Sequence, residues 1–213
     1  MSKSEREYRS MTMAIEERAE EDQGMVVSGY ASTFDDRYLL WKDEDVEVYE
    51  KVDRNAFDKT DMSDVIMQYD HAGRVFARIR NNTLTVAPDD KGLYVRADLS
   101  GTDIGRSLYQ EIAGGYTDRM SFGFTVDEDD RSIYFDEESG KEIVERTILR
   151  VGKLFDVSAV SIPANPSTVI SARNLDGVIE EARAERLKAK ELEERRSRLI
   201  DRARSFSKEE RND

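Results

Sequence analysis

The sequence contains no cysteine, and this absence excludes several classes of protein. Without cysteine there is no disulfide framework, no thiolate nucleophile and no cysteine-ligated zinc site. Histidine is almost as scarce, because His71 is the single histidine in 213 residues. One histidine excludes any site that needs two from the same chain, such as an HExxH zinc site. Histidine-based acid–base chemistry would therefore rest on His71, and we expect neither a metal nor a cofactor.

Long apolar runs are also missing, and no stretch is apolar enough for long enough to span a bilayer. The N-terminus is polar and acidic, whereas a signal peptide would be basic and then apolar. Positive charge is in deficit, with a formal net charge of -13. Binding to nucleic acid or to an anionic membrane needs clustered Lys and Arg that are not compensated. We therefore expect a soluble intracellular protein whose partners are proteins.

Short segments of alternating apolar and polar residues dominate what is present, and this pattern is typical of strands. After a charged end at 1–7 that we expect to fray, strands are predicted at 8–15, 25–34, 46–52, 65–69, 84–86, 93–99, 120–126, 142–149 and 154–160. We expect 8–15 to form a hairpin with 25–34, and 84–86 to form one with 93–99.

Few helices are expected between these strands. Residues 102–112 place apolar side chains on one helical face, with Thr102 or Asp103 as the N-cap. Residues 53–57 read as a turn into a short helix and residues 35–45 as an acidic loop. Residues 127–141 read as an acidic hairpin that is either a lid or only a long turn. The predicted fold class is α+β, mainly β: an antiparallel β-barrel flanked by short helices.

The composition changes abruptly at residue 173 to Glu, Arg, Lys and Ala. We therefore divide the chain into a domain at 1–172 and a charged tail at 173–213. The tail has a narrow, alanine-rich heptad seam with polar breaks at Glu185 and Arg196. It is compatible with a solvated helix or disordered segment, and equally with a helix that pairs with a second copy or with a partner.

Residues 118–126 are the stretch most suited to catalytic chemistry. Alternation points Met120, Phe122 and Phe124 into a core and leaves Ser121 beside Gly123 on the emptier face. A nucleophile needs such an opening, because a substrate backbone must come close to its hydroxyl. The same pattern is also compatible with a serine that has no catalytic role and is only a small residue on a solvated face.

If Ser121 is a nucleophile and His71 its base, the histidine needs a carboxylate to orient it. Asp70 is poorly placed, because neighbouring side chains in extended chain diverge. Asp156 is the better candidate, because it shares one strand face with Ser158 while the opposite face is apolar. A carboxylate in that position needs a partner to offset its desolvation, and solvent or an arginine would also serve.

The order of the segments resembles the prohead maturation proteases of tailed bacteriophages, relatives of herpesvirus assemblin. Residues 29–31 (Gly-Tyr-Ala), 55–57 (Asn-Ala-Phe) and 70–71 (Asp-His) are similar to the opening half of that family. Residues 120–124 (Met-Ser-Phe-Gly-Phe) resemble its Leu-Ser-Ile-Gly-Phe motif, and residues 155–166 its Pro-Ala-Asn-Pro ending. The resemblance covers about residues 8–172 and leaves out the charged tail.

The resemblance implies an assemblin-like fold and a serine endopeptidase with an acyl-enzyme mechanism. Its catalytic residues carry over to Ser121, His71 and Asp156, and Arg78 is a candidate oxyanion donor. The implied enzyme acts in the host cytoplasm, inside the prohead, on scaffold protein, on the scaffold arm of the major capsid protein and on itself. A homodimer is possible within this expectation.

This chain departs from the family pattern at three positions. Asp70 replaces the usual Asn, Asn55 the usual Gly, and Asp156 the commoner Glu. Assemblins use a second histidine in the third role, which this chain lacks. Two further interpretations stay open from the sequence: a non-catalytic internal scaffold or assembly factor of the same fold, and a β-barrel binding module.

Overall fold

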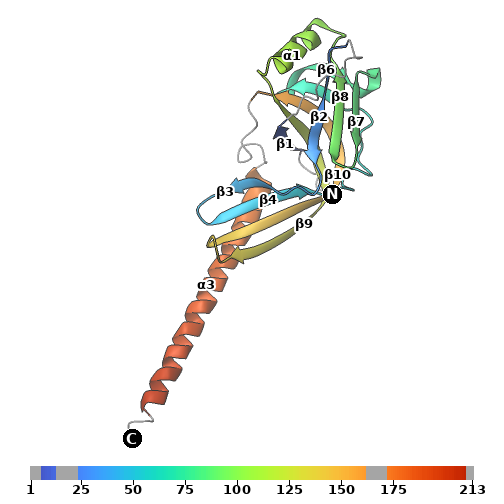
Figure 1. The fold of residues 1–213 in the computed structure, drawn as a ribbon. Helices are drawn as coiled ribbons and strands as arrows, with labels where there is room; N and C mark the ends of the chain where they lie inside the picture. The colour runs from blue at the N-terminus through green and yellow to red at the C-terminus, as the bar shows by residue number, and fades with distance from the viewer. Residues whose placement is uncertain (1–5, 13–23, 162–171, 210–213) are drawn as a thin grey trace.

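The structure, a computed structural model, describes residues 6–12, 24–161 and 172–209, which are mostly β-strands in two sheets (Figure 1). The elements are β1 (Arg6–Thr12), β2 (Val26–Thr33), β3 (Tyr38–Lys42), β4 (Val46–Val52), β5 (Ile66–Tyr69), β6 (Ala72–Arg78), η1 (Ile79–Asn81), β7 (Leu84–Pro88), β8 (Gly92–Asp98), α1 (Asp103–Ala113), β9 (Arg119–Asp136), β10 (Lys141–Val160) and α3 (Ala172–Glu209). The predicted mainly β, α+β class is confirmed. Within the described ranges no helix is both long and apolar enough to cross a membrane.

Strand β10 is the centre of the larger sheet, whose order is β1-β9-β10-β4-β3. It pairs antiparallel with β9 along most of its 20 residues. On its other edge it pairs parallel with β4 and then, further along, with β5, which carries β6. The sheet curls into a half-barrel that includes these two parallel pairs, whereas the sequence pattern predicted an antiparallel barrel.

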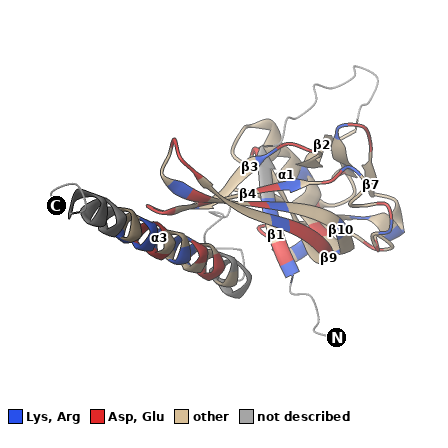
Figure 2. Ribbon diagram, turned by 90° about the horizontal axis from the view of Figure 1, so that it is seen from below, with Lys and Arg blue, Asp and Glu red and all other residues tan. Residues whose placement is uncertain are grey.

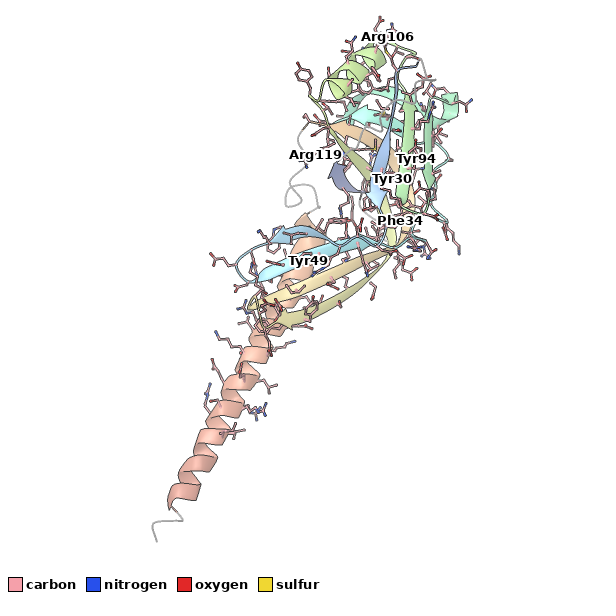
Figure 3. The ribbon with its side chains drawn as sticks, in the orientation of Figure 1. Tyr30, Phe34, Tyr49, Tyr94, Arg106 and Arg119 are labelled. Carbon is pink, nitrogen blue, oxygen red and sulfur yellow. The ribbon has the colours of Figure 1, made fainter. Side chains whose placement is uncertain are left out.

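The smaller sheet has the order β2-β8-β7 and packs its inner face into the main core. The β7–β8 hairpin is confirmed where the sequence predicted it. On β2 and β8, Tyr30 and Tyr94 are cross-strand partners whose ring centroids lie 5.5 Å apart (Figure 3). Aromatic pairs of this kind stabilise neighbouring strands.

The molecule has a body and an arm (Figure 1). In the body, the main core joins side chains of both sheets to Leu108 and Ile112 of α1. The arm consists of β3, β4 and the paired far halves of β9 and β10, with α3 running along it. A second, smaller core fills the arm, where Ile179 and Ala182 of α3 pack against Val48 and other apolar side chains.

Helix α1 follows its sequence signals closely. It runs from Asp103 to Ala113 with Thr102 as its N-cap, and the Thr102 side chain accepts a hydrogen bond from the Gly105 N–H at 3.0 Å. This bond satisfies one of the free N–H groups of the first turn. The predicted helix and cap are confirmed.

The predicted hairpin of 8–15 with 25–34 is wrong, because β1 and β2 lie in different sheets. β1 pairs instead with the outer edge of β9, from Arg6 opposite Thr125 to Thr12 opposite Arg119. Residues 6 and 7 of the end that was expected to fray are held in β1, where Glu7 and Arg9 are buried among opposite charges, and residues 1–5 lie outside the described residues. Residues 13–15 of the predicted strand lie outside the described residues.

Two other local predictions need correction, and a third is confirmed. Residues 38–42 form β3 rather than a loop, because they complete a ladder with β4 and bury Leu40. Residues 54–59 form successive turns rather than a helix. A hydrogen bond from the Thr60 hydroxyl to the Val151 carbonyl attaches the end of these turns to β10. The acidic hairpin predicted at 127–141 is confirmed, as the paired continuation of β9 and β10 into the arm.

Candidate active site

Ser121 lies on β9 in the larger sheet, opposite Ser158 of β10 on one side and Ser10 of β1 on the other. Its neighbours Phe122 and Phe124 point into the main core, as the alternation predicted. The opening that was expected above Ser121 is absent in this structure, because Ser121 has an exposure of 0%, so a substrate carbonyl reaches its hydroxyl only if a covering side chain moves. Side chains from other segments cover it, the His71 imidazole among them, and the alternation within one strand does not reveal them.

His71 occupies a tight turn between β5 and β6. Tyr69 pairs with Ala72, so Asp70 and His71 form a two-residue hairpin loop. Both loop residues have positive φ, 47° at Asp70 and 56° at His71, as a type I′ turn requires. A histidine in this region costs backbone energy, and such residues cluster at functional sites. The turn projects the imidazole over the sheet face that carries Ser121.

His71 bridges the other two predicted catalytic residues. Its Nε2 lies 2.6 Å from Ser121 Oγ, and its Nδ1 lies 2.5 Å from Asp156 Oδ1. An ionised carboxylate can only accept, so Nδ1 carries the proton and Nε2 is free to accept from the serine hydroxyl. The arrangement matches the nucleophile, base and orienting acid of a Ser-His-Asp triad.

Asp156 is fully buried on β10, yet both of its carboxylate oxygens are paired. Oδ1 accepts from His71 and, at 2.8 Å, from the Ser158 hydroxyl. Oδ2 forms an ion pair with the Arg6 guanidinium. These contacts offset the cost of removing a carboxylate from water. The side chain of Asp is long enough to reach His71 because β5 and β10 are direct neighbours.

Three side chains next to the triad were not predicted. Ser158 had a sequence signal, since it shares the strand face of Asp156. Arg6 and Tyr8 had none, because their positions depend on the pairing of β1 with β9, more than 100 residues away. Tyr8 contributes a ring whose centroid lies 4.3 Å from that of His71.

Arg78, the candidate oxyanion donor, is not brought to Ser121. It lies at the far end of the β5–β6 hairpin, opposite Ile66, about 20 Å from the His71 turn at a strand rise of about 3.3 Å per residue. Its guanidinium binds Asp64 at 2.8 Å and 2.5 Å. This hydrogen bond and charge lower the pKa of the Asp64 carboxyl.

Asp70 does not orient the histidine, as expected. Its carboxylate accepts from the N–H and the hydroxyl of Ser161, both at 3.3 Å, and so ties the turn to the end of β10. The Pro-Ala-Asn-Pro ending at 163–166 lies outside the described residues. In the ranges that the structure describes, no group of three or more His, Asp or Glu side chains could hold a metal ion.

Comparison with known proteins points to one family. The model of the caudovirus prohead serine proteases matches residues 13–181. The comparison with curated proteins gave no match. A solved structure described as that of the bacteriophage T4 capsid assembly protease, gp21, is similar at 12% identity and a TM-score of 0.37, over 75% of this chain and 99% of that one. Because the family model spans most of the sequence, the chain belongs to the caudovirus prohead serine protease family.

Proposed function

We propose that this protein is a serine endopeptidase that cleaves scaffold protein or the scaffold arm of the major capsid protein, and itself, inside the prohead. The observation that carries the proposal is the chain of two hydrogen bonds that links Asp156, His71 and Ser121. The family supports the reaction class and the setting in capsid assembly. Contact between Ser121 and His71 favours an enzyme over a non-catalytic internal scaffold, which would not need it.

The reaction would proceed through an acyl-enzyme. Ser121 Oγ attacks the scissile carbonyl carbon while His71 Nε2 takes the hydroxyl proton. The same nitrogen returns that proton to the leaving amine as the peptide bond breaks, a role worth roughly 10² to 10⁴ in rate. Asp156 holds Nδ1–H and stabilises the imidazolium between the two steps. A water molecule then attacks the acyl ester while His71 Nε2 takes its proton, and the carboxylic acid product leaves as Ser121 regains its hydroxyl proton.

The catalytic unit in this proposal is residues 1–172, and residues 173–213 are a docking element. The family match extends to residue 181, which includes the first turns of α3 that pack on the arm. The proposed partners are the major capsid protein and the scaffold protein, in the cytoplasm of the bacterial host.

Mass spectrometry of the protein co-expressed with the capsid protein of the same genome tests this function. The wild type is expected to truncate the capsid protein, itself or both, and Ser121→Ala is expected to leave both chains intact because the nucleophile is gone. Ser132→Ala is a matched control, since Ser132 lies on the same strand in the exposed arm. It should cleave as the wild type does.

Cleavage that persists in Ser121→Ala would rule out the assigned nucleophile. Intact chains in all three samples would instead favour the non-catalytic assembly factor. The masses of the fragments would identify the cleaved bonds and supply a peptide substrate for kinetics.

A further inference from the structure

Strand β1 brings two side chains to the triad from outside the region that the family model matches, which begins at residue 13. In its ladder with β9, Arg6 lies opposite Thr125 and Tyr8 opposite Gly123. Residues directly opposite in a ladder share a face of the sheet. Arg6 and Tyr8 therefore lie on the same face as Ser121, opposite positions that are four and two residues along β9 from it, respectively.

Arg6 contacts the carboxylate oxygen that the histidine does not use. It pairs with Asp156 Oδ2, while Oδ1 faces His71. The guanidinium is held in place, because it also lies over the Phe155 ring at 4.4 Å and the Tyr8 ring at 5.3 Å. Asp156 itself has an exposure of 0%, so water cannot replace Arg6 as the partner of Oδ2 without rearrangement.

Tyr8 and Gly123 define the rest of this environment. The Tyr8 ring packs beside the imidazole with an interplanar angle of 57°. Gly123 leaves the space in which Arg6 crosses the strand, because a Cβ atom there would lie 2.9 Å from Arg6 Nε and 2.5 Å from Asp156 Oδ2. The sheet face is thus shaped to admit an arginine at the carboxylate end of the triad.

We propose that Arg6 is a positioning residue of the active site. By occupying Oδ2 it fixes the rotation of the Asp156 carboxylate, so that Oδ1 stays in line with Nδ1 of His71, and its charge offsets the burial of that carboxylate. The Tyr8 ring limits the tilt of the imidazole. The importance of Arg6 for catalysis rests on the proposed function, but its effect on the His71–Asp156 hydrogen bond does not.

The single histidine makes this hydrogen bond directly observable by NMR of the full chain, since one imidazole Nδ1–H gives one signal. In the wild type that proton is expected to be shifted downfield and protected from exchange with water. In Arg6→Gln its exchange should be faster by about tenfold or more, the effect of weakening one charge-assisted hydrogen bond. Asp156→Asn replaces the carboxylate with a neutral amide and defines the signal of a ring without a carboxylate partner.

Two further variants make the test specific. Arg54→Gln removes an exposed arginine that pairs with Asp35, and it should exchange as the wild type does. Arg6→Lys keeps the positive charge that offsets the burial of Asp156 but lacks the planar guanidinium. The exchange rate of the His71 Nδ1–H proton in this variant should therefore fall between those of the wild type and Arg6→Gln. Arg6→Lys carries the test if Arg6→Gln does not fold. Wild-type exchange in the folded Arg6 variants, or an equal effect in Arg54→Gln, would overturn the proposal.

Kinetics separate this proposal from the proposed function. With a cleaved peptide in hand, Arg6→Gln should lower kcat and leave KM nearly unchanged, because Arg6 acts on the triad and not on substrate. Faster exchange in Arg6→Gln with no Ser121-dependent cleavage by any variant would keep Arg6 as a positioning residue and refute the protease. Ser121-dependent cleavage with unchanged exchange would refute the role of Arg6 alone.

Discussion

Gly123 is the residue over which Arg6 and Asp156 meet, and it shows how little room the site has. An added Cβ would lie 2.5 Å from Asp156 Oδ2 and 2.9 Å from both Arg6 Nε and Tyr8 Cε1. Real Cβ atoms do not approach other atoms this closely, so Asp156 or its partners would have to move. Asp156 has the least freedom, because it is short and fully buried on a central strand.

We predict that Gly123→Ala lowers kcat by roughly 10²-fold, the effect of displacing a catalytic group by about 1 Å. Gly101→Ala is the matched control, because a Cβ at Gly101 meets nothing within 4 Å. The measurement is kcat and KM on a peptide that contains a cleaved bond identified by mass spectrometry. Equal kcat in Gly123→Ala and Gly101→Ala would show that the site adapts to the methyl group.

The residues of the proposed triad could be named from sequence because each has a local signal. Ser121 follows from alternation beside a glycine, His71 is the single histidine, and Asp156 is a carboxylate on a largely apolar strand. Their mutual distances, and the contacts of Arg6 and Tyr8, depend on which strands pair. That pairing joins segments far apart in the chain, so no local pattern encodes it. The catalytic roles themselves stay predictions.

Strand β1 has a second face, and it anchors the strand through buried charges. Arg9 donates to both carboxylate oxygens of Glu50 on β4, at 2.5 Å and 2.7 Å. Arg146 on β10 donates to both oxygens of Glu7, at 2.8 Å and 3.0 Å. Breaking such a buried pair from one side is strongly destabilising, because it leaves an uncompensated charge. These two bidentate pairs hold β1 where Arg6 reaches the site.

Glu7 makes this anchor dependent on pH. Burial opposes ionisation of its carboxyl, but the hydrogen bond from Arg146 and the charges of Arg9 and Arg146 outweigh burial and lower the pKa to about 2 from the usual 4.5. Because the folded pKa lies below the unfolded one, the stabilisation is complete above about pH 4.5. It is lost as pH falls toward 2.

We predict that Glu7→Gln lowers the free energy of unfolding at pH 7 by an amount on the order of 3 kcal/mol, from a pKa difference of about 2.5 units. The difference between variant and wild type should shrink between pH 4.5 and pH 2. Urea denaturation at pH 7 and pH 3 measures it. Glu128→Gln, which removes a half-exposed ion pair with Arg150, should cost at most about 1 kcal/mol. A cost for Glu7→Gln that does not change with pH would contradict the account.

Elements were predictable where local chemistry decides them. The Thr102 cap and the apolar face of α1, and the turn between β7 and β8, are local features, and both predictions are confirmed. β3 was not predicted, because five residues between acidic turns become a strand only by pairing with β4. The predicted hairpin between β1 and β2 is wrong for the same reason. β1 pairs with the edge of β9, where its charged side chains have buried partners such as Glu50.

At the scale of the whole molecule, α3 changes character along its length. Near its start it is attached to the arm, where Ile179 and Ala182 are buried. Arg183 and Arg186 then bind Asp43 and Asp45 at 2.6 Å and 2.5 Å. Further along, Leu187, Leu192 and Leu199 are each about 60% exposed or more. The helix runs out from the arm with Lys and Arg interspersed among Asp and Glu (Figures 1 and 2).

These observations favour a partner for the outer part of α3. A single helix in water gains little stability from propensity alone, and exposed leucines at heptad spacing, as at 192 and 199, suit a second helix. A second copy of this chain is the less favourable partner, because each copy carries a net charge of -13. We therefore predict that the outer half of α3 binds a helix of another prohead protein.

Removing residues 189–213 tests this assignment. The truncated protein keeps every arm contact of α3 described above, so its unfolding midpoint and its kcat on a small peptide should match the full chain. Its amount per prohead should fall severalfold, as measured by quantitative mass spectrometry of purified particles. The double variant Leu192→Ser/Leu199→Ser should reproduce the loss without shortening the helix, because it removes only exposed apolar contacts. Undiminished incorporation of both variants would refute docking through α3, and concentration-dependent dimers of the full chain that the truncation abolishes would identify a second copy as the partner instead.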